Sequence, residues 1–219
     1  MPQFLQKNKN HFFKGLLGAL LVLLCFTSCF KNLTQLTVIY QNNFDDYDQK
    51  GIKVFPYLGQ ANPISIVKFN GNPVLGMFNN TSIEITLPGL PQHTAITVSF
   101  DLYIHDMWRN DLWKYTFDGV DYKLTGFSND STVQQAYPNN IGNGSALSPA
   151  MTGAQNKNLP GACALANSPH GTAMYRIEQT ILHSNSTFDF QCSDAGAFLY
   201  TPCNRTWSID NLTITMIKN

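Results

Sequence analysis

The sequence predicts an all-β protein, a two-sheet antiparallel β-sandwich preceded by a signal peptide. Residues 94–105 alternate strictly between apolar and polar side chains, and this period of two is typical of a long, half-buried β-strand. Asp118-Gly119 separates two further alternating runs, which is the strongest short-range signal for a β-hairpin. The 15 glycines and 11 prolines indicate a chain with many turns.

The remaining strands follow from alternating or short apolar runs bounded by turn residues. They are expected at residues 36–40, 53–58, 64–69, 81–87, 174–182, 187–192 and 206–217. The runs 174–182 and 187–192 are expected to form a second hairpin, which turns at residues 183–185. In the last strand the apolar residues change parity across Asp210-Asn211, which predicts a β-bulge. Residues 128–171 form the one long irregular stretch, and loops of this length are usually functional lids or spacers.

Residues 1–28 have the features of a targeting segment. Three lysines, Lys7, Lys9 and Lys14, precede an apolar run at residues 15–25. This run is shorter than the ~20 residues that a membrane-spanning helix needs, so a signal peptide is predicted.

The segment that ends the signal peptide, Phe26-Thr27-Ser28-Cys29, resembles the lipobox of bacterial lipoproteins, although Phe26 stands where leucine is usual. The resemblance implies that Cys29 is lipidated and becomes the mature N-terminus. The expected organisation is a signal peptide at 1–28, a lipid-anchored tether at 29–36 and a sandwich at 37–219. An ordinary secretory signal and an uncleaved anchor are the alternatives.

Composition limits the partners of the mature chain. Removal of residues 1–28 takes away three of the 14 basic residues and leaves 11 against 14 acidic residues, a net charge of −3. Nucleic-acid binding requires a basic face, so this charge argues against a nucleic-acid partner.

Three cysteines are left in the mature domain after Cys29: Cys163, Cys192 and Cys203. Cys192 and Cys203 bracket a short step between two predicted strands and are the favoured disulfide pair in an oxidising compartment. Pairing of Cys163 with Cys192 or with Cys203 remains an alternative. No two of the three have the spacing of a zinc knuckle.

Acidic residues near both ends of the domain predict a structural calcium site. Asp45, Asp46 and Asp48 follow the first strand, and Asp210 and Asn211 lie in the last. Terminal strands of sandwiches often pair, which would bring together the oxygen ligands that calcium prefers. A cation would also relieve the repulsion among the carboxylates. The alternative is a solvated acidic turn.

A polar and aromatic corner follows the long strand and is the candidate ligand site. Its residues are His105, Asp106, Trp108, Arg109, Asp111 and Trp113. Tryptophan rings can stack on sugars while polar groups fix the orientation of a ligand. One alternative is that Asp106 and Asp111 bind a second cation. Another is a structural corner in which Arg109 pairs with one of these aspartates and Trp108 or Trp113 belongs to the core.

The sequence favours a binding protein over an enzyme. Glycoside hydrolysis needs two carboxylates across the scissile bond, whereas the only glutamates, Glu84 and Glu178, each stand alone in an alternating strand. The chain also lacks the Gly-x-Ser-x-Gly elbow of serine hydrolases, and its histidines are expected in turns or on the surface.

Two segments resemble strands of secreted concanavalin A-like jelly-roll domains of the lectin, laminin-G and MAM kind. They are Leu90-Pro-x-His-Thr-x-Ile-x-Val-x-Phe-Asp-Leu-Tyr-Ile-x-Asp and Trp207-Ser-Ile-Asp-Asn-Leu-Thr-Ile. The resemblance implies a jelly-roll sandwich that acts in binding or adhesion. In such domains the middle acidic motif usually reads Asp-Ser-Trp-Asp-Gly, and Arg109 replaces its second carboxylate in this chain.

These observations together predict a lipid-anchored, non-catalytic module of the bacterial outer membrane that binds a glycan or an envelope protein. One alternative is a secreted hydrolase that acts on polysaccharide with its site under the 128–171 loop. Another is a purely structural envelope protein.

Overall fold

The computed structural model describes residues 34–56, 66–142, 144–194 and 203–218. The predicted signal peptide, Cys29 and most of the tether lie outside these residues. The sandwich belongs to a compact unit, Leu36–Lys218. Within the described ranges, no helix is long and apolar enough to span a membrane.

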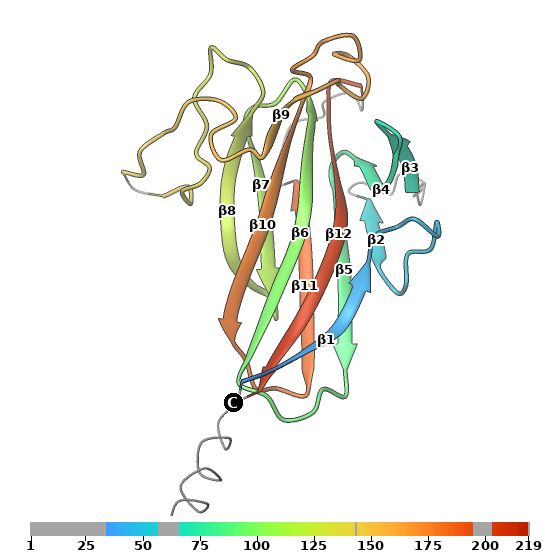
Figure 1. The fold of residues 1–219 in the computed structure, drawn as a ribbon. Helices are drawn as coiled ribbons and strands as arrows, with labels where there is room; N and C mark the ends of the chain where they lie inside the picture. The colour runs from blue at the N-terminus through green and yellow to red at the C-terminus, as the bar shows by residue number, and fades with distance from the viewer. Residues whose placement is uncertain (1–33, 57–65, 143, 195–202, 219) are drawn as a thin grey trace, which may run out of the picture. The chain divides into compact units, whose positions relative to one another are not determined.

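Two antiparallel sheets form the sandwich, as predicted (Figure 1). The seven-stranded sheet has the order β3 (Ile66–Phe69), β4 (Asn72–Phe78), β12 (Arg205–Lys218), β6 (Ala95–Asp106), β10 (Thr172–Leu182) and β9 (Asn156–Leu159), and β1 (Gln35–Asn42) also pairs with β12. The five-stranded sheet has the order β2 (Lys53–Pro56), β5 (Thr81–Pro88), β11 (Thr187–Asp194), β7 (Arg109–Phe117) and β8 (Val120–Ser128).

Strand β6 is the centre of the seven-stranded sheet. It pairs with β10 on one side and with β12 on the other along nearly its whole length. Its even-numbered residues, including Phe100, Leu102 and Ile104, are fully buried between the sheets. Across the core, Phe100 meets Trp113 of β7 and Phe190 of β11, with ring centroids 6.1 and 5.5 Å apart.

The hairpin prediction is right for β7–β8 and wrong for β10–β11. Asp118 and Gly119 both have positive φ, at 49° and 75°, as the tight hairpin turn requires. Strands β10 and β11, in contrast, belong to different sheets, so the residues between them cross the sandwich. Alternation identifies a strand but does not identify its partner.

Internal hydrogen bonds of the Gln135 side chain hold the irregular region after β8 in place, so this region is not an open lid. Gln135 is fully buried, and its Oε1 accepts hydrogen bonds from the N–H groups of Ser128 and Met151. Its amide nitrogen donates to the carbonyls of Tyr137 and Thr152. One buried amide therefore holds several turns of the loop together.

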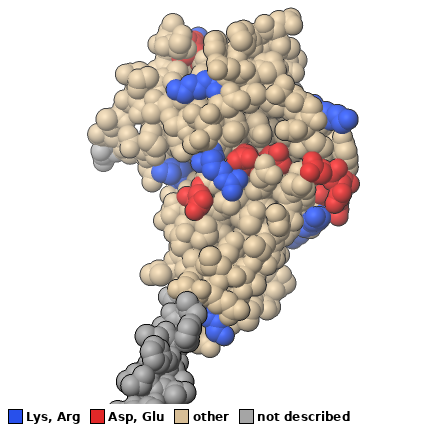
Figure 2. Space-filling model, in the orientation of Figure 1, with Lys and Arg blue, Asp and Glu red and all other residues tan. Residues whose placement is uncertain are grey.

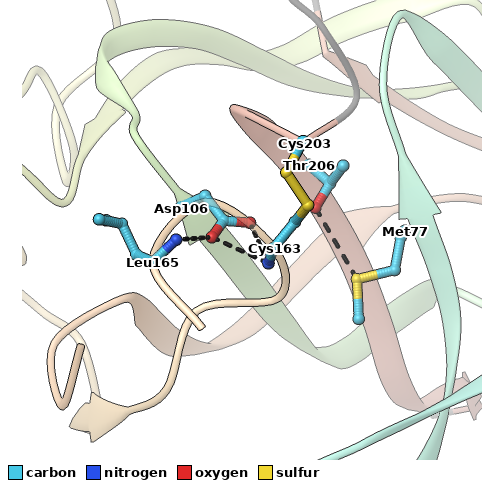
Figure 3. The surroundings of a disulfide bond; sticks show 6 residues. All are labelled: Met77, Asp106, Cys163, Leu165, Cys203 and Thr206. Carbon is cyan, nitrogen blue, oxygen red and sulfur yellow. Dashed lines mark hydrogen bonds between the residues drawn. A yellow bond between two sulfur atoms is a disulfide. The ribbon is translucent and has the colours of Figure 1, made fainter. Parts of the chain in front are cut away.

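The disulfide joins Cys163 to Cys203, with their Cα atoms 5.0 Å apart (Figure 3). The predicted Cys192–Cys203 pair is therefore wrong, and one of the two alternatives is present. Cys192 is a free, buried thiol because it lies on the face of β11 that points into the core, with Phe188 and Phe190. Burial raises the pKa of this thiol well above its usual value.

Candidate ligand-binding site

The first residue of the predicted ligand corner, His105, lies on the outer face of the seven-stranded sheet but is fully buried. Its ring packs against Phe69, and its two nitrogens contact the hydroxyls of Thr172 (3.0 Å) and Ser208 (2.6 Å). Burial lowers the pKa of His105 to about 3, so the ring is neutral. His105 is therefore a satisfied interior group.

Asp106 is also fully buried and clamps the irregular loop (Figure 3). Its carboxylate accepts hydrogen bonds from the N–H groups of Cys163 (3.1 Å) and Leu165 (2.9 Å). This clamp and the disulfide hold the same turn from two sides, which gives Asp106 a structural role.

Trp108 and Trp113 have no exposed ring face. The indole N–H of Trp108 donates to the carbonyl of Thr206 at 3.0 Å, and the Trp113 ring packs against Trp207 at 6.0 Å. Buried rings cannot stack on a sugar, so the predicted platform is wrong for these two residues. They belong to the core, as the alternative had it.

The remaining two corner residues form ion pairs. Arg109 is exposed and pairs with Asp130 (3.3 Å) instead of an aspartate of the corner. Asp111 pairs with the buried Arg205 at 3.1 Å, and Arg205 also pairs with Asp194 at 3.1 Å. A buried arginine between two carboxylates fixes β12 to both β7 and β11, which gives Asp111 a structural role.

The residues predicted to bind calcium are only partly brought together. β1 pairs with β12, as expected, and the register of β12 shifts after Asp210, which confirms the predicted bulge. The pKa of Asp210 is raised to about 6, first by burial and then by the charges of Asp101 and Asp45. Asp101 was not among the predicted ligands. It lies opposite Asp210 in the register. Figure 2 shows that acidic and basic side chains form a band across the middle of this face.

The aspartates of this region have surroundings that differ from those of a metal site. Asn211 donates its side-chain amide to Asp101 at 2.8 Å, whereas Asp45, Asp46 and Asp48 form an exposed turn. Among the described residues, no three histidine, cysteine, aspartate or glutamate side chains form a group that could hold a metal. The calcium site therefore stays a prediction.

An open cavity of about 320 Å³ lies on the outer face of the five-stranded sheet. Its lining is polar and comes from β5, β7, β11 and the β7–β8 turn: Glu84, Thr86, Thr116, Gly119, Asp189 and Gln191. We call this set the polar groove. It offers two carboxylates, one amide and two hydroxyls, so it both donates and accepts hydrogen bonds.

The strand register explains why these side chains meet. Gln191 of β11 lies between Glu84 of β5 and Thr116 of β7, and all three point away from the core because their neighbours point inward. At one end, Lys53 pairs with Glu84 at 3.7 Å. Phe55 lies two residues further along β2 and is 45% exposed. The groove thus has an ionic edge, and Phe55 lies outside its lining, opposite Ser82.

The sequence analysis did not predict the polar groove. Each of its residues is the ordinary outward-facing member of an alternating strand, and no motif marks it. Only the strand order β5–β11–β7 brings Glu84, Gln191 and Thr116 into one row. Because strands far apart in the chain supply them, sequence spacing held no signal.

Comparisons with known proteins do not identify a family for this chain. No family model matches the chain, and no curated protein matches it in sequence. Among solved structures, the chain is similar to a family 35 carbohydrate-binding module from Clostridium thermocellum. The two share 10% sequence identity at a TM-score of 0.37, over 82% of this chain and 97% of that one. A likeness of this size does not establish a ligand.

Proposed function

We propose that this protein is a non-catalytic module of the cell envelope that binds a glycan in the polar groove. The observation that carries the proposal is the cavity of about 320 Å³ with its polar lining. Ligand pockets in proteins range from about 300 to 1,000 Å³, so the groove has room for a short stretch of sugar units. Sugar hydroxyls both donate and accept hydrogen bonds, as do the groups that line it.

The surroundings of the groove suit an extended ligand. A row of polar side chains crosses all five strands in register: Lys53, Glu84, Gln191, Thr116 and Asp121. Phe55 offers an exposed ring beside this row, on which a sugar could stack. A glycan chain would therefore lie across the strands.

The location of the module is part of the same proposal. The lipobox-like segment that ends at Cys29 supports a lipid anchor in the outer membrane, and a secreted protein is the alternative. Growth of the expressing cells with labelled palmitate tests it. We expect label in the wild type and none in the Cys29→Ser variant, whereas an unlabelled wild type would favour secretion.

Titration calorimetry against a panel of soluble oligosaccharides (cellohexaose, xylohexaose, laminarihexaose and mannohexaose) tests glycan binding. Gln191→Ala should weaken binding about tenfold, because one well-placed hydrogen bond is lost. Glu178→Gln is the matched control, since Glu178 is exposed on the other sheet. Equal loss in both variants would contradict the site. No binding by the wild type would favour a protein partner or a purely structural role.

One observation favours the hydrolase alternative. Glu84 faces Gln191, so Asp189 is its diagonal neighbour on β11. Diagonal pairs are about 7–8 Å apart, within the ~6.5–9.5 Å that separates the carboxylates of inverting glycosidases. A general acid, however, needs apolar surroundings to keep its proton, and Glu84 has the Lys53 ammonium at 3.7 Å. Release of reducing ends by the wild type, and its loss in Glu84→Gln, would establish catalysis.

A further inference from the structure

Two histidines expected on the surface or in turns are in fact buried against each other. His93 precedes β6 and His183 follows β10, and the two residues are 3% and 7% exposed, respectively. His93 Nε2 lies 2.6 Å from His183 Nδ1. His93 Nδ1 lies 2.6 Å from the carbonyl oxygen of Pro91, and His183 Nε2 lies 3.1 Å from Asp118 Oδ2.

This chain of atoms has three contacts: two hydrogen bonds, each of which needs a proton, and the contact of His183 Nε2 with the Asp118 carboxylate, where an unprotonated nitrogen would face the carboxylate with its lone pair. The Pro91 carbonyl and the Asp118 carboxylate can only accept, and a neutral imidazole carries one N–H. Two neutral rings would supply two protons, so one contact would set two lone pairs against each other at 2.6–3.1 Å. The contact of His183 Nε2 with Asp118 Oδ2, at 3.1 Å, does not have hydrogen-bond geometry, and a protonated His183 would make it an ion pair.

We infer that His93 and His183 share three ring protons, that the extra positive charge is balanced by Asp118, and that this positions one wall of the polar groove. The second half of the inference rests on the proposed function. The three residues come from separate segments of the chain, and nothing in their spacing suggests that they meet.

Asp118 connects the histidine pair to the groove. Its Oδ2 faces His183, and its Oδ1 accepts the backbone N–H of Asp189 at 2.9 Å. The backbone N–H of Asp118 donates to the Asp189 carbonyl, also at 2.9 Å. Asp189 and the neighbouring Gly119 both line the groove. Loss of the extra proton would leave the Asp118 carboxylate facing a lone pair, so the turn that carries Gly119 would shift.

The charged groups around the pair are few. Asp118 lies on the β7–β8 turn, and Asp189 on β11 contacts it through the backbone. Lys218 follows Ile217 of β12, whose carbonyl accepts the N–H of Thr94 next to His93. From β11, the apolar ring of Phe188 packs edge-on against His183. Asp118 is thus the charge in direct contact with the pair.

Long-range ¹H–¹⁵N NMR of the purified protein counts the ring protons directly. In the wild type at neutral pH we expect three protonated nitrogens on His93 and His183 together. In Asp118→Asn we expect two, because an amide donates to His183 Nε2 and removes the need for the third. His170→Gln, which changes an exposed loop histidine, is the control and should leave the count at three. Two protonated nitrogens in the wild type would overturn the inference.

The coupling to the groove has its own readout. The amide signals of Gly119 and Asp189 should shift with pH together with the histidine signals in the wild type and stay fixed in Asp118→Asn. Affinity for the oligosaccharide panel should fall several-fold over the same rise in pH, and again only in the wild type. Fixed amide signals in the wild type would overturn the coupling. Failure of every oligosaccharide to bind, with moving signals, would reject the proposed ligand and leave the histidine pair intact.

Discussion

Substitution of Asp210 by asparagine should stabilise the protein at neutral pH. Burial, and then the charges of Asp101 and Asp45, raise the pKa of Asp210 from 3.8 to about 6. This difference corresponds to at most about 3 kcal/mol by which the folded state disfavours the ionised carboxyl, and solvent screening reduces the effect. Asparagine has the same shape, carries no charge and keeps the Oδ1 that accepts the N–H of Asn211 at 2.7 Å.

The direction of the pKa shift determines how the gain in stability depends on pH. Because the pKa of Asp210 is higher in the folded than in the unfolded state, its contribution to stability is fully present below about 3.8 and is lost as the pH rises to about 6. The variant should therefore gain up to about 3 kcal/mol at pH 7 and almost nothing at acid pH below 3.8.

Urea unfolding of the two proteins at both pH values measures the gain in the free energy of unfolding. The control is Asp121→Asn, which removes an exposed carboxylate from a surface pair with Lys114 and should change stability by no more than about 0.5 kcal/mol. A gain that is equal at both pH values, or no gain at pH 7, would refute the reasoning from charge and burial.

Three further predictions concern the elements that hold the sandwich together. Calcium should raise the melting temperature at neutral pH above its value in EDTA, because a cation would relieve the repulsion at Asp210; identical temperatures would reject the calcium site. Cys203→Ser should lower the free energy of unfolding by about 4 kcal/mol, because the disulfide to Cys163 closes a 40-residue separation; reduction of the wild type should have the same effect. Arg205→Met should cost roughly 3–5 kcal/mol in chemical unfolding, because it leaves two buried carboxylates without their cation, and a neutral outcome would show that they protonate instead.

The sequence predicted the elements of the fold better than their partners. Strict alternation identified β6, and Asp118-Gly119 identified the β7–β8 turn, because both signals are local. The partners of β10 and β11 could not be predicted in this way, since pairing depends on contacts between distant segments. Cys192 illustrates the same limit: its distance from Cys203 in sequence is short, but its side chain points into the core.

The candidate site was misplaced for a related reason. Alternation tells which face of a strand is polar but not whether another layer covers that face. His105 lies on the polar face of β6 and is covered by Phe69, and Asp106 ends the strand and is covered by the loop that carries Cys163. Conversely, Glu84 and Gln191 have the sequence pattern of ordinary solvated positions, and only the strand register shows that they lie side by side.

Chemical-shift mapping tests the central claim, that the polar groove binds a glycan, most directly. Titration of the ¹⁵N-labelled protein with the four oligosaccharides should move the amide signals of Thr86, Thr116, Gly119, Asp189 and Gln191 and leave those of the Asp106–Asp111 corner in place. Shifts confined to the corner or to the 128–171 loop, or no shifts with any of the four, would contradict the account.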